Sequence, residues 1–146
     1  MKIRTGFVSN SSSSSFIVID SSKGYQQLAT DKLIVGAAGN TEFGWESDRY
    51  KDIYSRINFA YIQTDYGRMY EHFKMLENVL LENIQGLTSI IWNIDDECNS
   101  NKVWGYIDHQ SSWYEGENIE MFDSEQALKD FIFGVGSYIQ GGNDND

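Results

Sequence analysis

Hydrophobic positions along the chain first form compact runs of strand length. Such runs lie at 16–19, 33–35 and 90–92, and they consist mostly of large apolar residues. Short apolar runs bounded by polar or glycine-rich segments are typical of buried strands. We expect the segment 2–8 to pair with 16–19, which leaves the serine-rich segment 9–15 as the connection between two strands.

The middle of the chain changes to a helical period. Apolar and aromatic residues recur at spacings of three and four between 50 and 61, and again between 66 and 80. This spacing places them on one face of a helix, and Gly86 is suited to the left-handed conformation that ends one. A shorter helix is expected after Asp123, with Asp123 as its cap and Gln126 bonding back to it. The pattern therefore predicts two consecutive central helices and one short C-terminal helix.

Strands are expected before, between and after these helices, without a regular alternation of strand and helix. The segment 103–107 alternates as a hairpin partner of 87–94 would, and 138–139 has the character of a last edge strand. This order favours the α+β class, with a mostly antiparallel sheet and the helices packed on it. For 146 residues we expect one domain over 1–140 and a polar tail at 141–146.

The chain is strongly acidic, with 22 acidic and 11 basic residues and a formal net charge of −11. Its Lys and Arg residues are scattered singly along the sequence. A chain of this charge is repelled by phosphate backbones and by anionic lipid. We therefore expect no direct nucleic-acid ligand and no membrane association. The oligomeric state is left open.

Cys98 is the only cysteine, so no intramolecular disulfide can form and a thiolate metal site is not indicated. The chain has no apolar run near the ~20 residues that cross a bilayer, and its first residues lack the apolar core of a signal peptide. These features indicate a soluble intracellular protein of a reducing compartment. We expect neither a metal nor a cofactor.

The serine-rich segment permits three interpretations. It is a flexible hairpin loop, a set of hydroxyls bonded to neighbouring loops, or an anion site made by backbone amides and hydroxyls. It lacks the glycines and the lysine of a phosphate-binding loop. The anion-binding interpretation rests on Ser11, Ser12, Ser13, Ser14 and Ser15.

Two further groups of residues are candidates for a site. His109 could move a proton, as histidine does near neutral pH, although Asp108 beside it would point to the other face of a strand; a structural histidine is the alternative. Aromatic residues beside acidic ones resemble a protein-binding patch, because Trp and Tyr dominate interface hot spots; coverage of the core is the alternative. This patch would comprise Trp113, Tyr114, Glu115 and Glu117, together with Trp45 and Glu46.

Three strings of sequence resemble a group of short proteins from bacteriophages and their bacterial hosts. The first is the string from Gly6 to Phe16, the second runs from Gly105 to Ser111, and the third from Ile139 to Asp144. The resemblance implies a context, a phage-type accessory protein in a bacterial cytoplasm. It implies no activity, cofactor or catalytic residue. If the three strings meet in space, a real site there becomes better supported.

Without a complete catalytic set, we expect a protein that does not catalyse a reaction. It would bind a host or phage protein through its acidic, aromatic surface, with imitation of nucleic acid as one form of that binding. The alternative is a small anion- or nucleotide-binding enzyme that uses the segment 9–15 and His109. A minor virion component is a further alternative.

Overall fold

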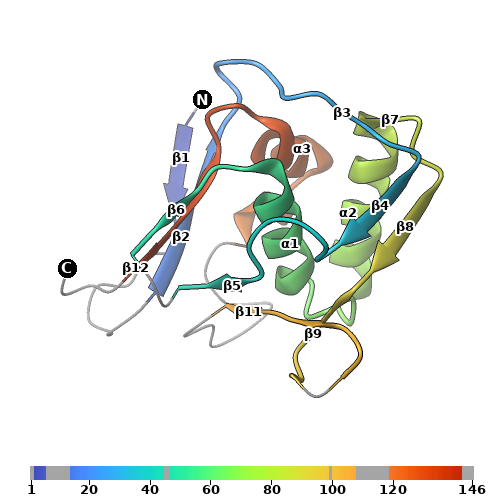
Figure 1. The fold of residues 1–146 in the computed structure, drawn as a ribbon. Helices are drawn as coiled ribbons and strands as arrows, with labels where there is room; N and C mark the ends of the chain where they lie inside the picture. The colour runs from blue at the N-terminus through green and yellow to red at the C-terminus, as the bar shows by residue number, and fades with distance from the viewer. Residues whose placement is uncertain (1, 6–13, 45–46, 99, 108–118, 143–146) are drawn as a thin grey trace.

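The computed structural model describes residues 2–5, 14–44, 47–98, 100–107 and 119–142. A four-stranded sheet stands at one side of the molecule and a ribbon of short parallel strand pairs at the other (Figure 1). The helices lie between them (Figure 1). The α+β class is thereby confirmed, and the largest sheet is antiparallel as predicted.

The four-stranded sheet joins both ends of the described chain. Its order is β1-β2-β12-β6, and every neighbouring pair is antiparallel. The predicted pairing of the first two strands is confirmed, but the last strand is not an edge strand, because it lies between β2 and β6. The strands are β1 (Lys2–Thr5), β2 (Ser14–Asp20), β6 (Arg49–Tyr50) and β12 (Tyr138–Gly142).

The ribbon consists of parallel pairs of short strands. β3 pairs with β7, β4 with β8, β9 with β10, and β5 with β11. Side chains of β4 alternate between exposed and buried, so that Leu33 and Val35 face the helices. These strands are β3 (Leu28–Ala29), β4 (Lys32–Val35), β5 (Glu42–Phe43), β7 (Ile84–Gln85), β8 (Ser89–Trp92), β9 (Ile94–Asp95), β10 (Val103–Trp104) and β11 (Tyr106–Ile107).

The expected hairpin between 87–94 and 103–107 is wrong. β10 runs parallel to β9, and the chain then continues into β11, which pairs with β5. Local alternation of apolar residues indicates a strand but carries no information on its direction relative to a partner.

The two consecutive central helices are confirmed, and a third helix follows near the C-terminus. Asp52 caps the first helix by accepting from the Ser55 amide, and Ser124 caps the last by accepting from the Ala127 amide. The predicted cap Asp123 is therefore one residue too early, and Gln126 bonds to Asp130 instead. None of the helices in the described segments is long and apolar enough to cross a membrane. The helices are α1 (Ile53–Gln63), α2 (Tyr70–Asn83), the 3₁₀ turn η1 (Glu120–Phe122) and α3 (Glu125–Phe133).

Helix α1 runs through the core, with almost every residue buried. Phe59 lies at its middle and packs edge-on against Phe43 of β5, with ring centroids 5.1 Å apart. On another side its ring centroid is 6.1 Å from that of Phe131 in α3. The Phe59 ring therefore connects three elements that are distant in sequence.

One cation is buried in this core. The Arg56 side chain is 1% exposed, and its Nη1 donates to the carbonyls of Phe131 and Gly134 at the end of α3. Its Nη2 donates to the Gln26 side chain at 3.1 Å. Burial lowers the pKa of Arg56 to about 10, while the charge of Asp52 acts in the opposite direction. The guanidinium therefore stays charged at neutral pH and neutralises the carbonyl end of α3.

Candidate functional site

Most of the residues predicted from the sequence as site residues lie outside the described segments. Two of the serines, Ser14 and Ser15, belong to β2, and Ser15 is buried. The remaining candidates outside the described segments are Ser11, Ser12, Ser13, Trp45, Glu46, Asp108, His109, Trp113, Tyr114, Glu115 and Glu117.

Two of the three polar strings do meet within the described residues. Ser14 and Ser15 pair with Gly142 and Gly141 in the four-stranded sheet. The amide and carbonyl of Gly141 also exchange hydrogen bonds with Asp48. This meeting point lies at the start of β2, whereas the candidate pocket described next lies at its far end.

A pocket of about 190 Å³ is built where two strands end beside the start of a third. Because β12 is antiparallel to both neighbours, its first residues lie between the carboxyl ends of β2 and β6. The turn after α3 closes one wall. The lining residues are Asp20, Lys23, Arg49, Lys51, Val135, Gly136, Ser137 and Tyr138.

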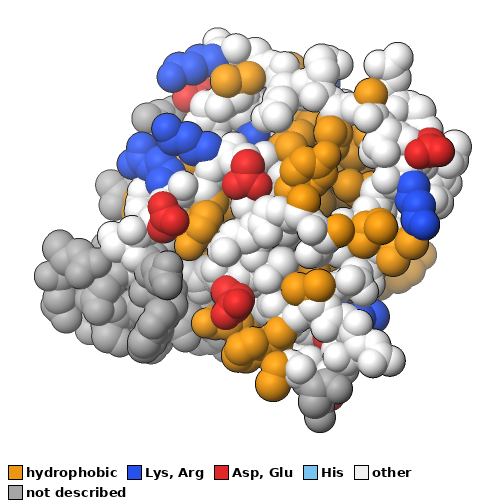
Figure 2. Space-filling model, in the orientation of Figure 1, with side chains coloured by type: hydrophobic (Ala, Val, Ile, Leu, Met, Phe, Trp, Pro, Cys, Tyr) orange, Lys and Arg blue, Asp and Glu red, His pale blue; other side chains and the backbone are white. Residues whose placement is uncertain are grey.

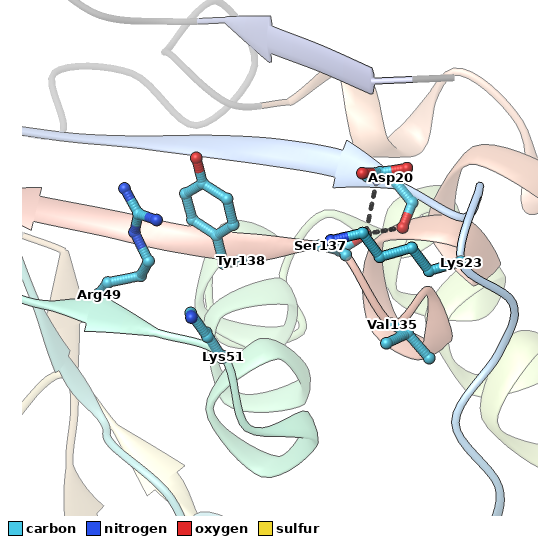
Figure 3. A pocket seen from close by; sticks show the side chains of 8 residues that line it. Asp20, Lys23, Arg49, Lys51, Val135, Ser137 and Tyr138 are labelled. Atoms are coloured by element: carbon cyan, nitrogen blue, oxygen red, sulfur yellow. Dashed lines mark hydrogen bonds between the residues drawn. The ribbon is translucent and has the colours of Figure 1, made fainter.

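Charged side chains face the pocket from two sides (Figure 3). Arg49, Lys51 and Tyr138 lie on one side, and Asp20 and Lys23 on the other, near Val135 and Ser137 (Figure 3). Lys and Arg side chains also gather on this part of the surface in the space-filling view, at the upper left of Figure 2. The fold thus assembles a basic site from cations that are scattered in the sequence.

Arg49 is held in position by two neighbours on β12. Its guanidinium carbon lies 4.3 Å from the centroid of the Tyr138 ring, a cation–π contact. Its Nε donates to Oε1 of Gln140 at 3.0 Å, across the strand pair. These contacts use the flat face and the inner nitrogen of the guanidinium. The two terminal nitrogens, which form the fork that matches a carboxylate or phosphate, make no hydrogen bond to another described residue.

Among the described residues, none of the three lining cations forms a salt bridge, although Lys23 lies beside Asp20. Ion pairs within the described residues are made by Arg68 with Asp65 and Asp96, and by Lys74 with Glu77. Lys23, Arg49 and Lys51 are exposed and belong to none of these pairs. In a chain with twice as many acidic as basic residues, three cations and one carboxylate among the described residues of this lining make a local excess of positive charge.

Asp20 is the one acidic residue among the described residues of the lining, and it is 7% exposed. Its Oδ1 accepts from the amide and the hydroxyl of Ser22, at 2.9 and 2.6 Å. These hydrogen bonds lower the pKa of Asp20, and the charge of Lys23 lowers it further. Asp20 is therefore a fixed carboxylate at neutral pH. Its Oδ2 lies over Gly136, where a Cβ would come within 2.5 Å of it.

Ser137 connects Asp20 to α3 in this wall of the pocket. Its buried hydroxyl accepts from the Asp20 amide at 2.8 Å and donates to the Asp130 carbonyl of α3 at 2.6 Å. The Gly136 amide also donates to the Asp20 carbonyl. The position of Asp20 is thus set by the end of α3 and the turn that follows it.

The pocket was missed in the sequence, although one local signal was present. Arg49 and Lys51 are two residues apart beside a short strand, a spacing that places both side chains on the same face. Nothing local connects them to Lys23 or to the segment 135–138. That connection depends on the pairing of β12 with both β2 and β6.

A second surface feature is aromatic. The Trp104 side chain is 43% exposed and lies beside Tyr106, with ring centroids 5.0 Å apart. The Thr41 hydroxyl donates to the Trp104 carbonyl and connects β10 to the loop that precedes β5. Within the described residues, no group of His, Cys, Asp and Glu side chains is arranged to hold a metal ion.

The chain matches no model of a known protein family, and neither a curated protein nor a solved structure shows significant similarity to it.

Proposed function

We propose that this protein binds a small anionic ligand in the pocket between β2, β12 and β6. The observation that carries the proposal is the convergence of Lys23, Arg49 and Lys51 on one pocket of an acidic chain, where the described lining holds one carboxylate, Asp20, against three cations. Cations held near one another repel, so an anion between them stabilises the arrangement.

The size and surroundings of the pocket favour a small ligand over a polymer. Its volume of about 190 Å³ is below the roughly 300–1,000 Å³ of pockets that take drug-sized molecules. The net charge of −11 repels a nucleic-acid backbone, whose charges extend beyond the pocket. A compact anion interacts mainly with the local cations, because charges beyond about 10 Å are screened at 0.1 M salt.

The lining supports binding rather than catalysis. The eight lining residues include no histidine and no cysteine, and the one carboxylate is already held ionised by Ser22. A general base works best when its pKa is near the working pH, and the pKa of Asp20 is shifted downward. We therefore propose recognition of an anion without chemical conversion.

We expect Arg49→Gln to weaken binding of inorganic phosphate by about tenfold or more, the scale of a lost charge-assisted hydrogen bond. The reason is the loss of the guanidinium fork that Tyr138 and Gln140 hold in place. Isothermal titration calorimetry at low salt measures the affinity. Arg68→Gln is the matched control, because Arg68 is an exposed arginine with its own acidic partners. Equal affinities for phosphate in the two variants, or no phosphate binding at all by the unaltered protein, would refute the proposal.

As a second candidate function, we propose binding of a protein with a basic surface, as first inferred from acidic and aromatic residues. The exposed Trp104 beside Tyr106 favours it, since exposed Trp and Tyr side chains are common anchors of interfaces. The acidic charge of the chain complements a basic partner and speeds encounter. Membership of a phage-type group, host-protein binding and a virion role remain parts of this second proposal.

This second candidate predicts that Trp104→Ala loses a partner that the unaltered protein captures at stoichiometric amount from bacterial lysate, with a loss of affinity of about 2 kcal/mol or more, the scale of an interface hot spot. Tyr70→Ala is the control, because Tyr70 is 70% exposed and lies on another element, at the start of α2. Capture that survives Trp104→Ala, or capture lost equally in both variants, would count against an interface at Trp104.

A further inference from the structure

The two sides of the pocket differ in charge, and this difference constrains the ligand beyond its being an anion. On one side Arg49 and Lys51 stand together, and none of the described lining residues between them is acidic (Figure 3). On the other side Asp20 stands beside Lys23 (Figure 3). One end of the pocket is therefore positive, and the other end has an acceptor and a cation together.

The positive end matches a dianion. An arginine and a lysine together present two positive charges and several N–H donors to one group. A dianion balances both charges, whereas a carboxylate balances only one. A phosphate monoester carries about −1.5 to −2 charge at pH 7 and three acceptor oxygens. It can accept from Arg49 through two oxygens and from Lys51 through the third.

The other end of the pocket requires a donor from the ligand. A carboxylate beside an anionic ligand is repelled unless it receives a hydrogen bond. Ser22 satisfies Oδ1 of Asp20, and Oδ2 is directed to the side of Gly136, which lines the pocket. The donor on the ligand is a neutral hydroxyl rather than an ammonium group, since Lys23 next to Asp20 repels a second cation.

We infer that the pocket recognises a phosphate monoester that carries hydroxyl groups, with the phosphate at Arg49 and Lys51 and a hydroxyl donating to Asp20. This inference rests on the proposed anion-binding function and names the class of its ligand. The short turn at Val135, whose side chain is exposed at the rim, leaves room for the carbon chain that joins the two groups.

A matched pair of ligands tests the inference on the unaltered protein. Glycerol 3-phosphate and n-propyl phosphate share the phosphate and the three-carbon chain, and only the first has hydroxyls. We expect glycerol 3-phosphate to bind about tenfold more tightly, the scale of a hydrogen bond to a charged group. Calorimetry at pH 7.5, where the phosphate is a dianion, measures both affinities. Equal affinities, or tighter binding of n-propyl phosphate, would overturn the inference while leaving anion binding intact.

Variants and further probes then locate the two ends of the ligand. In Asp20→Asn the preference for glycerol 3-phosphate should fall to near one, while Arg49→Gln should weaken both ligands by the same factor. Retained binding of n-propyl phosphate by Asp20→Asn shows that this variant is folded. If Asp20→Asn does not fold, the comparison of glycerol 3-phosphate with n-propyl phosphate on the unaltered protein still tests the inference. Tighter binding of phosphoethanolamine or of glycerate than of glycerol 3-phosphate would also overturn the inference. Failure of every anion to bind would refute the proposed function itself.

Discussion

Replacement of Arg56 by alanine is expected to lower the free energy of unfolding by about 3–5 kcal/mol, the range for truncation of a large buried side chain. The guanidinium donates to two carbonyls at the end of α3 and to Gln26, and it is 1% exposed. Alanine removes this donor from the buried Phe131 carbonyl and opens a cavity, and both effects destabilise the folded state. Unfolding in guanidinium chloride, followed by tryptophan fluorescence, measures the change.

Two further arginine variants separate the causes. Arg56→Lys keeps the charge but loses the fork, so its loss should lie between zero and that of Arg56→Ala. Arg68→Ala removes an exposed arginine whose ion pairs are with Asp65 and Asp96, and it should cost about 1 kcal/mol or less. A loss for Arg56→Ala no larger than that for Arg68→Ala would show that the buried guanidinium contributes nothing to stability.

Phe59→Ala should cost about 3–5 kcal/mol, as is usual for removal of a buried phenyl ring. The ring is fully buried and packs against Phe43 and Phe131, so the variant loses this packing between α1 and both β5 and α3. Denaturant unfolding with an unchanged m-value would show that stability alone has changed.

The control for this variant is an exposed aromatic residue. Tyr70→Ala removes a ring that is 70% exposed, and the change should stay within about 0.5 kcal/mol. Similar losses for the two variants would mean that Phe59 does not connect the elements of the core.

The helices could be predicted because their signals are local. A stripe of apolar residues at spacings of three and four identifies a helix without knowledge of its neighbours, and α1 and α2 lie where the stripes are. The predicted cap Asp123 differs by one residue from the observed cap Ser124, because both residue types cap helices well.

Strand partners and the pocket could not be predicted in the same way. The runs at 16–19 and 138–139 identify strands, but nothing in either run says that they pair with each other. The pocket could not be predicted for the same reason, because Asp20, Arg49 and Ser137 come together only when β12 pairs with both β2 and β6. The candidate site residues predicted from composition instead belong to serine-rich and aromatic segments, which lie largely outside the described residues.

The central place of β12 also has a consequence for the newly made chain. Asp20 and Ser137 are bonded across a separation of 117 residues. At roughly 5–20 residues per second, a ribosome needs roughly 6–23 s to add that length. During this interval β1 is present to pair with β2 but β12 does not yet exist, so the other edge of β2 stays open to other chains. The pocket beside Asp20 and Ser137 therefore cannot form before the segment 137–142 has been synthesised.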